Sequence, residues 1–210
     1  MKPVCLVLGA GAGIGGTVAA KFASEGYHSY LCRRSDQEGL DKLIKGIEDA
    51  GGSASGSLLN AIEEDVLEEI ITKVESDVGP IEVLVYNLGA QTGMKLLSQT
   101  THKEFEWGWR MASFGLFRVA KVLCPIMAER GKGTFLVTSA TAAMRGNATQ
   151  HSHAAAMGAR RMLCQSLNAE FAPKGIHVSH IVVDGAVDAP DTLGKMLGPE
   201  MYQQLRETKG

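Results

Sequence analysis

Short apolar runs alternate with amphipathic stretches along almost the whole chain. The first run, VCLVLG at residues 4–9, is apolar throughout and ends in glycine. Such a run is typical of a strand buried on both faces of a parallel sheet, since a half-exposed strand would alternate with polar residues. Further strands are predicted at residues 28–32, 81–87, 133–139 and 176–183, with a weak strand at residues 53–59.

The stretches between these runs carry apolar residues at helical spacing. In residues 38–52, for example, Leu40, Leu43, Ile44 and Ile47 recur on one helical face before a pair of glycines. The same reasoning predicts helices at residues 16–27, 38–52, 62–80, 103–130 and 154–171. Six strands alternating with helices predict an α/β fold with a doubly wound parallel sheet, because right-handed crossovers place helices on both faces. No linker or repeat interrupts the alternation, so we expect a single domain over residues 1–210.

Composition narrows the functional classes. The chain has 210 residues, 45% of them hydrophobic, which is enough to build the core of one domain. A net charge of -2 gives no electrostatic footprint for nucleic acid. No apolar stretch reaches membrane-spanning length, so we expect no membrane partner. The four cysteines are widely spaced and have no metal-binding or redox-motif pattern. We therefore expect them to be reduced and buried, in an intracellular, cytoplasmic protein.

A glycine-rich loop, LGAGAGIGG, joins the first predicted strand to the first predicted helix. Glycine there permits a tight turn and lets a diphosphate approach the backbone, while the helix N-terminus offers free amides. We therefore interpret Gly9, Gly13, Ile14 and Gly15 as cofactor-binding residues of a dinucleotide site. The alternative is a plain tight turn without a ligand.

The second predicted strand ends in Cys32, Arg33 and Arg34. An NAD site usually has an acidic residue at this place, whereas an NADP site favours a cation for the 2′-phosphate. Arg33 or Arg34 could pair with that phosphate through a planar guanidinium, so NADP(H) is favoured over NAD. The alternative is that both arginines are ordinary solvated surface residues.

Several motifs in register resemble the short-chain dehydrogenase/reductase family over nearly the whole length. YNLG at residues 86–89 resembles the family's NNAG segment, TSATAAMRG resembles the segment with the catalytic serine, and SLNAEFAPKGIHVSHIVVDG resembles the region leading to the sixth strand. The resemblance implies that Ser139 is the catalytic serine. It also implies that Asn60 lies near the adenine, and that Asn87, Gly89 and Gly185 border the cofactor.

The resemblance further implies a mechanism, from which this sequence departs. In the family a tyrosine exchanges a proton with the substrate oxygen while the nicotinamide exchanges a hydride, and a lysine binds the ribose. Alignment on Glu170 places His153 at the tyrosine position and Met157, a candidate cofactor contact, at the lysine position. The family's asparagine in the preceding helix falls on Ala112.

Two functions follow from these departures. An unperturbed histidine has a pKa of roughly 6.5 and needs no neighbouring lysine to exchange protons near neutrality. His153 would then be the general acid or base and Ser139 the donor to the oxygen of a small carbonyl or alcohol substrate. The alternative is a catalytically inactive nucleotide-binding or scaffold protein, in which Met157 fills the core. His151 and His153 lack a clustered carboxylate or cysteine, so we predict no metal site.

The predicted long helix and the last segment bear on assembly. Residues 105–127 are apolar around much of the helix, more than one buried face requires, which favours a homodimer or homotetramer. The alternative is a central helix wholly inside one subunit. After the sixth strand the sequence resembles the family's variable substrate loop and helix. The seventh strand of the family has no counterpart before Gly210, so we expect that strand either to be lacking or to be supplied by residues outside this sequence.

Overall fold

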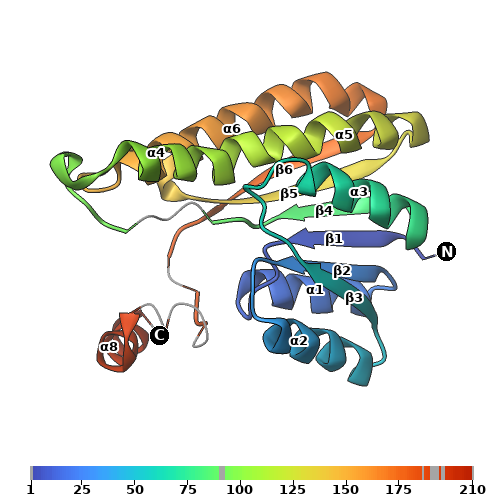
Figure 1. Ribbon diagram of the computed structural model, residues 1–210, viewed down its shortest axis with the longest axis horizontal. Helices are drawn as coiled ribbons and strands as arrows, with labels where there is room; N and C mark the ends of the chain where they lie inside the picture. The colour runs from blue at the N-terminus through green and yellow to red at the C-terminus, as the bar shows by residue number, and fades with distance from the viewer. Residues whose placement is uncertain (1, 90–92, 186, 190–193, 195–196, 210) are drawn as a thin grey trace.

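Six parallel strands form one sheet in the order β3-β2-β1-β4-β5-β6 (Figure 1). The computed structural model describes residues 2–89, 93–185, 187–189, 194 and 197–209. The strands are β1 (Val4–Leu8), β2 (His28–Arg33), β3 (Ser53–Leu58), β4 (Ile81–Tyr86), β5 (Gly133–Ala140) and β6 (Ile176–Val183). The predicted doubly wound sheet is confirmed, and the described residues contribute six strands to it.

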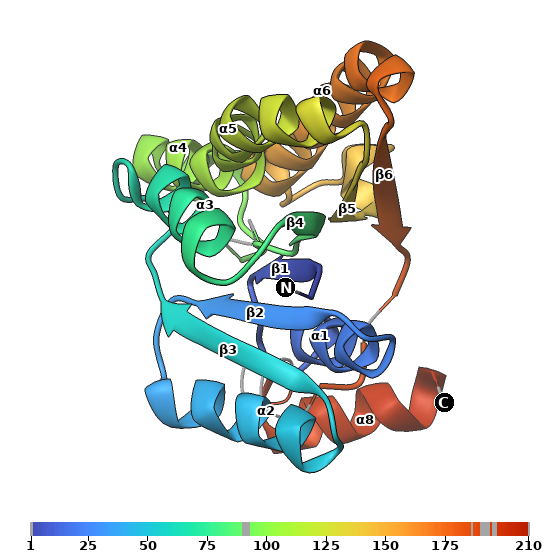
Figure 2. The same ribbon diagram turned by 90° about the vertical axis from the view of Figure 1, so that its right-hand side faces the viewer.

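Helices cover both faces of the sheet (Figures 1 and 2). One face carries α1 (Ile14–Ser24) and α2 (Gln37–Asp49), and the other carries α3 (Val66–Asp77), α4 (His102–Trp109), α5 (Gly115–Arg130) and α6 (His151–Phe171). Each face has its own apolar core, because successive strand residues point to opposite sides. In β1, Leu6 and Leu8 belong to the core under α3, α5 and α6, whereas Cys5 and Val7 belong to the core under α1 and α2.

The predicted helix at residues 103–130 is confirmed, with one irregularity. Helices α4 and α5 are joined without a break by a π-helical turn, Arg110–Phe114. Within the described residues, the continuous stretch His102–Arg130 is long and apolar enough to cross a membrane by length and composition. Our expectation that no stretch has this length was therefore wrong. Half of its most apolar window is buried inside the fold, where Leu116 and Leu123 pack in the core.

Helices α3 and α6 begin three or more residues away from their predicted starts. Helix α3 begins at Val66, since Asp65 adopts a left-handed conformation with φ of 61°. Helix α6 begins at His151, three residues before the predicted start, which places His153 in its first turn. Contacts distant in sequence account for the early start. Lys95 forms an isolated β-bridge with Gln150, and Ser152 Oγ donates a hydrogen bond to the Glu104 carbonyl at 3.1 Å.

The C-terminal part of the sheet ends in β6. No other strand of the described chain pairs with the outer edge of β6, where Ile181 and Val182 are exposed. Helix α8 (Pro199–Lys209) follows it. All four cysteines are free and buried, as predicted. Burial raises the pKa of the Cys5, Cys32 and Cys124 thiols to about 12, so none of these three is a reactive thiolate near neutral pH.

Candidate active site

The candidate residues meet at the carboxyl ends of the strands. Because all six strands are parallel, these ends lie at one edge of the sheet, where open α/β sheets bind their ligands. β1 and β4 are neighbours whose following helices lie on opposite faces, and the ends of two such strands are where open α/β sheets bind ligands. The candidates at or just beyond the strand ends are Gly9, Arg33, Arg34, Asn60, Asn87, Gly89, Ser139 and Gly185.

The glycine loop between β1 and α1 is packed so tightly that side chains are excluded. Gly9 has φ of +94°, and a Cβ there would lie 2.6 Å from the Asn87 carbonyl oxygen. A Cβ on Gly15 would lie 2.2 Å from the Gly9 carbonyl oxygen. Gly13 is the residue that caps the N-terminus of α1, and no side chain supplies the cap. The surface that the glycine loop offers to a ligand therefore consists of backbone alone.

The same loop leaves amides available to a ligand. The amides of Gly16 and Thr17 donate to the carbonyls of Gly11 and Gly13. Within the described part of the chain, no acceptor is found for the amides of residues 12–15, which include Gly13, Ile14 and Gly15. Free amides at a helix N-terminus, next to a backbone that a Cβ would fill, fit an anionic diphosphate. The loop thus fits the cofactor that the sequence predicts.

Asn87 links this loop to the centre of the sheet. Its side-chain amide donates from Nδ2 to the Gly9 carbonyl at 2.9 Å, and its Oδ1 accepts from Thr138 Oγ1 at 2.8 Å. Asn87 therefore fixes the distance between the ends of β1, β4 and β5. Gly89, two residues later, is exposed, and a Cβ on it would meet no described atom within 4 Å.

The two arginines at the end of β2 differ. Arg33 is paired with Asp36, with Nη2 2.9 Å from Oδ2, and Asp36 also accepts from the Gly39 amide at the start of α2. Arg34 is exposed and has no ion pair or hydrogen bond in the described chain. Of these two arginines, Arg34 is therefore the one without a carboxylate partner in the described chain.

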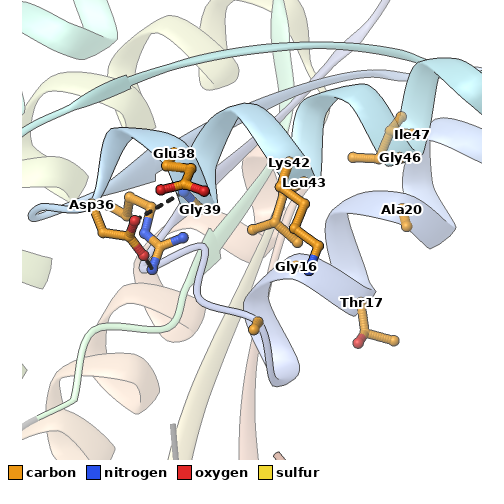
Figure 3. A pocket seen from close by; sticks show the side chains of 12 residues that line it. Gly16, Thr17, Ala20, Asp36, Glu38, Gly39, Lys42, Leu43, Gly46 and Ile47 are labelled. Carbon is orange, nitrogen blue, oxygen red and sulfur yellow. Dashed lines mark hydrogen bonds and ion pairs between the residues drawn. The ribbon is translucent and has the colours of Figure 1, made fainter. Parts of the chain in front are cut away.

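A cavity of about 620 Å³ lies between α1 and α2, beside the glycine loop (Figure 3). Gly16, Thr17 and Ala20 of α1 face Leu43 and Gly46 of α2 across it. Ala12 of the glycine loop and Arg33 also line the cavity. No sequence pattern indicates this cavity, because it arises from small residues on two helices whose separation is a tertiary property.

Asn60 lies in the loop after β3, where its Nδ2 donates to Glu63 Oε1 at 2.9 Å. Arg118 of α5 holds this loop. Its Nη1 donates to the Glu63 carbonyl at 2.9 Å, and its Nε donates to Glu68 Oε1 at 2.8 Å. The hydrogen bond from Arg118 lowers the pKa of the Glu68 carboxyl. Sequence reasoning missed Arg118, since its partners lie about 50 residues away along the chain.

Ser139 and Met157 are brought together, as the predicted site requires. Ser139, at the end of β5, is buried, and its Oγ lies 3.6 Å from Met157 Sδ as a weak hydrogen bond. Met157 packs with alanines in a small apolar cluster, which consists of Ala112, Ala142, Ala143, Ala156 and Met157. His153 lies one turn before Met157 on α6 and is partly buried.

Arg160, which the sequence analysis did not select, is the largest fully buried side chain in the structure described. It lies on α6 and donates hydrogen bonds to the carbonyls of Leu88, Ala112 and Thr138. Its guanidinium lies over the Tyr86 ring, 5.2 Å from the centroid. The only sequence signal was a pair of arginines in an otherwise small-residue helix.

The segments flanking the start of α6 carry exposed apolar side chains. Met94 and Leu97 are each 71% exposed, and Leu96 and Met144 are each 56% exposed. Lys95, between Met94 and Leu96, forms an isolated β-bridge with Gln150, which lies three residues before His153.

Two further predictions concern Gly185 and metals. Gly185, after β6, has φ of +148°, a conformation that favours glycine. No group of three or more metal-ligating side chains occurs among the residues described.

Comparison with known proteins agrees with this geometry. The model of the short chain dehydrogenase family matches residues 3–194. The chain belongs to the short-chain dehydrogenase family. A curated relative, the 3-oxoacyl-[acyl-carrier-protein] reductase FabG of Thermotoga maritima, is 29% identical over 205 residues, which are 98% of this chain and 80% of the relative.

Solved structures of short-chain dehydrogenases also match. A short-chain dehydrogenase from Rhodopseudomonas palustris is 33% identical with a TM-score of 0.81, over 86% of this chain and 84% of that one. A gluconate 5-dehydrogenase from Burkholderia cenocepacia, solved in complex with NADP and tartrate, is 26% identical with a TM-score of 0.81, over 91% of this chain and 74% of that one. The predicted family and its Rossmann-type fold are therefore confirmed, and the family is one of oxidoreductases that act on small molecules.

Proposed function

We propose that this protein is an NADP(H)-dependent oxidoreductase that interconverts a small carbonyl compound and its alcohol. The observation that carries the proposal is the glycine loop, whose free amides and exclusion of side chains suit a diphosphate. A relative that is 26% identical was solved with NADP, which supports NADP(H) over NAD. Arg34, the exposed cation without a carboxylate partner in the structure described, is the candidate for the 2′-phosphate.

The other cofactor contacts follow from the order of the strands. Gly9, Gly13, Ile14 and Gly15 would hold the diphosphate, and Asn60 would lie toward the adenine. The nicotinamide half would lie over the ends of β4 to β6, where we place the contacts Asn87, Gly89, Met157 and Gly185. Met157 would offer this half an apolar surface, since its side chain is already buried beside Ser139.

The proton transfer is assigned to His153 and Ser139. NADPH, when bound, supplies the hydride that adds to the carbonyl carbon. Ser139 donates a hydrogen bond to the carbonyl oxygen, which makes that carbon more electrophilic. Protonated His153 gives its proton to the same oxygen, so that the alcohol forms and His153 ends neutral. In the reverse direction neutral His153 accepts the hydroxyl proton. His153 would thus take the tyrosine's role, with Met157 at the lysine position.

The surroundings suggest what the substrate and the assembly look like. The exposed Met94, Leu97 and Met144 near the start of α6 favour a substrate with an apolar group, because flexible methionines adapt to apolar ligands. The exposed Phe105 and Phe117 of the long helix favour a homodimer or homotetramer formed through α4 and α5. Buried, free cysteines are consistent with a cytoplasmic site of action, which we propose as well.

A paired histidine experiment tests the catalytic assignment. NADPH oxidation is measured with a panel of aliphatic and aromatic ketones for the wild type, His153→Ala and His151→Ala. The second variant is the matched control, because His151 lies two residues away on the same helix. We expect His153→Ala to lower kcat by about 100-fold or more while the NADPH dissociation constant is unchanged. Equal activity of the two variants would contradict the assignment.

One observation favours a second function, that of an inactive nucleotide-binding or scaffold protein. Ser139 Oγ is directed at Met157 Sδ, and the side chains packed around Met157 are alanines, which offer no proton path. On this account the wild type binds NADPH but oxidises none of it with any ketone of the panel. NADPH binding without turnover would therefore favour the second function over the first.

A further inference from the structure

The buried side chain of Arg160 connects three separate segments at the site. Its Nε donates to the Ala112 carbonyl at 2.9 Å, in the π-helical turn before α5. Its Nη1 donates to the Thr138 carbonyl at 2.7 Å, on the residue before Ser139. Its Nη2 donates to the Leu88 carbonyl at 2.7 Å, on the residue after Asn87. One guanidinium on the helix of His153 thereby contacts the ends of β4 and β5.

No carboxylate of the described chain pairs with this buried charge. Arg160 is 1% exposed, and its contacts are the three carbonyls and the face of the Tyr86 ring. A buried cation without an anion is costly, so its hydrogen bonds must be well placed for the fold to keep it. The planar fork of arginine can meet three fixed carbonyls at once, whereas the single ammonium of lysine cannot hold the same geometry.

The hydrogen bonds continue from Arg160 to the glycine loop. Thr138, whose carbonyl accepts from Arg160, donates through its Oγ1 to Asn87 Oδ1 at 2.8 Å. Asn87 in turn donates from Nδ2 to the Gly9 carbonyl at 2.9 Å. An unbroken series of contacts therefore runs from the helix of His153, through β5 and the end of β4, to the first glycine of the loop.

We propose that Arg160 is a positioning residue that couples the glycine loop to α6. Through Thr138 and Asn87 it holds the backbone of the loop and the helix of His153 in one fixed arrangement. Linkage between two sites is reciprocal, so a ligand that orders the loop also orders α6 through the same contacts. Any effect of this coupling on catalysis by His153 rests on the proposed oxidoreductase function. The coupling itself, through the hydrogen bonds described, does not.

Hydrogen exchange on the nucleotide-free protein tests the coupling without any assay of activity. The reporters are the amides of Gly9 and Ala10, both of which donate to the Cys32 carbonyl, and that of Gly16, which donates to the Gly11 carbonyl. The first variant is Thr138→Val, which removes one hydroxyl and keeps the shape and the Arg160 contact. The control is Thr134→Val on the same strand, whose hydroxyl makes no hydrogen bond in the described structure.

We expect Thr138→Val to speed exchange at the three reporter amides about fivefold, because it removes the partly buried hydrogen bond from Thr138 Oγ1 to Asn87 Oδ1 and the longer one to the Tyr86 carbonyl. Thr134→Val should leave them within about twofold of the wild type. Unchanged exchange at the reporters in Thr138→Val would overturn the proposal. Because no nucleotide is present, this result does not depend on whether the protein turns NADPH over, and a failure of the oxidoreductase function would leave it standing.

A double variant separates coupling from a local structural role. Arg160→Lys keeps the charge but loses the fork, and we expect it to speed exchange at Gly9 and Ala10 as Thr138→Val does. If both act through one series of contacts, the double variant should exchange no faster than the faster single variant. Multiplied effects in the double variant, or faster exchange confined to Ala112, Thr138 and Leu88, would overturn the proposal. Should Arg160→Lys fail to fold, Thr138→Val alone decides.

Discussion

The two halves of the carboxyl edge of the sheet differ in what the proposed site consists of. On the side of β1 to β3 it consists of backbone, and glycines keep side chains away from the free amides of residues 12–15. On the side of β4 to β6, the proposed site consists of side chains, namely Ser139 on β5 and His153 and Met157 on α6. Backbone amides are independent of residue type wherever glycine is kept, whereas one substitution on α6 changes the chemistry.

Because of this difference, the fold can keep nucleotide binding by the glycine loop while the chemistry of the side chains on α6 changes. The glycine loop and α6 are joined through Asn87, Thr138 and Arg160, and those contacts use backbone carbonyls for the most part. The hydrogen bonds of that series in the described chain do not include the side chain of Met157. These contacts can therefore persist when another apolar residue of similar size stands at position 157.

The largest effect on NADPH affinity is expected from a methyl group in the glycine loop. In Gly15→Ala the Cβ would lie 2.2 Å from the Gly9 carbonyl oxygen, so the loop must shift. We expect an unfolding free energy lower by about 1–3 kcal/mol. We also expect a roughly hundredfold weaker NADPH affinity, since several charge-assisted hydrogen bonds are lost together. Calorimetric titration and chemical denaturation measure the two quantities.

Gly46→Ala is the matched control for that variant. Gly46 lies inside α2, where a Cβ would meet nothing within 4 Å. Alanine there should stabilise the protein by about 0.5–1 kcal/mol, because glycine is unfavourable within a helix. If Gly15→Ala behaved like Gly46→Ala, the close approach of the backbone would not matter and the comparison of the two sides would fail.

The next effect is on stability and tests the side of β4 to β6, where side chains make up the proposed site. Met157→Lys would place an ammonium among buried alanines and one turn from the charge of Arg160. We expect the free energy of unfolding to fall by about 3 kcal/mol, because a buried charge without a partner is costly. Met157→Leu, a change of similar volume, should cost less than about 1.5 kcal/mol. Urea denaturation of both variants measures the difference, and equal stability would mean that position 157 still accommodates a lysine.

A smaller effect distinguishes the two arginines after β2. Arg34→Gln should weaken NADPH binding about tenfold relative to NADH, since it removes an unpaired cation from the proposed 2′-phosphate site. Arg33→Gln should change that ratio less, because Asp36 already pairs with Arg33 at 2.9 Å. Competitive titrations with both nucleotides give the ratio. The reverse ranking of the two variants would show that the Asp36 pair opens to bind phosphate.

The smallest effect is a dependence of stability on pH, to which one histidine on each side of the sheet contributes. Burial lowers the pKa of His28 on β2 and of His180 on β6, and the charges of Arg160 and Arg161 lower that of His180 further. Below about pH 6.5 the unfolded chain binds protons at these positions that the folded chain resists. Stability should therefore fall as the pH drops from 7 toward 5.

Denaturation at several pH values checks this expectation, with His180→Gln as the comparison. The variant should show a shallower fall between pH 7 and 5, since one of the two histidines no longer contributes. A slope that is identical in the variant would mean that His180 titrates normally in the folded protein. His28, whose ring nitrogens both lie 2.7 Å from serine hydroxyls on β3, would then account for the whole effect.

The fold could be predicted because its signals are local and repeat. Continuous apolar runs such as residues 4–8 and 83–86 are required by a sheet covered on both faces, and glycine spacing identifies the loop. Even the weak strand at residues 53–58 forms, since each of its residues pairs with β2. The family resemblance assigned Ser139 and Met157 to one site, and in the structure their side chains are in contact.

The residues that hold the site together could not be predicted in the same way. Arg160 contacts carbonyls 22, 48 and 72 residues away, and Arg118 contacts Glu68 50 residues away. Backbone carbonyls carry no residue type, so no pattern in the sequence marks them as partners. The pairing of Arg33 with Asp36 was also missed, although it is local, because it depends on the turn that precedes α2.

A nuclear magnetic resonance titration of the uniformly labelled wild type with NADPH tests the central claim most directly, namely that backbone amides of the glycine loop hold the diphosphate. We predict saturable shifts, the largest of them at the amides of Gly13, Ile14 and Gly15, and the same shifts in His153→Ala. The absence of binding, or saturable binding that leaves these three amides unshifted, would contradict the account.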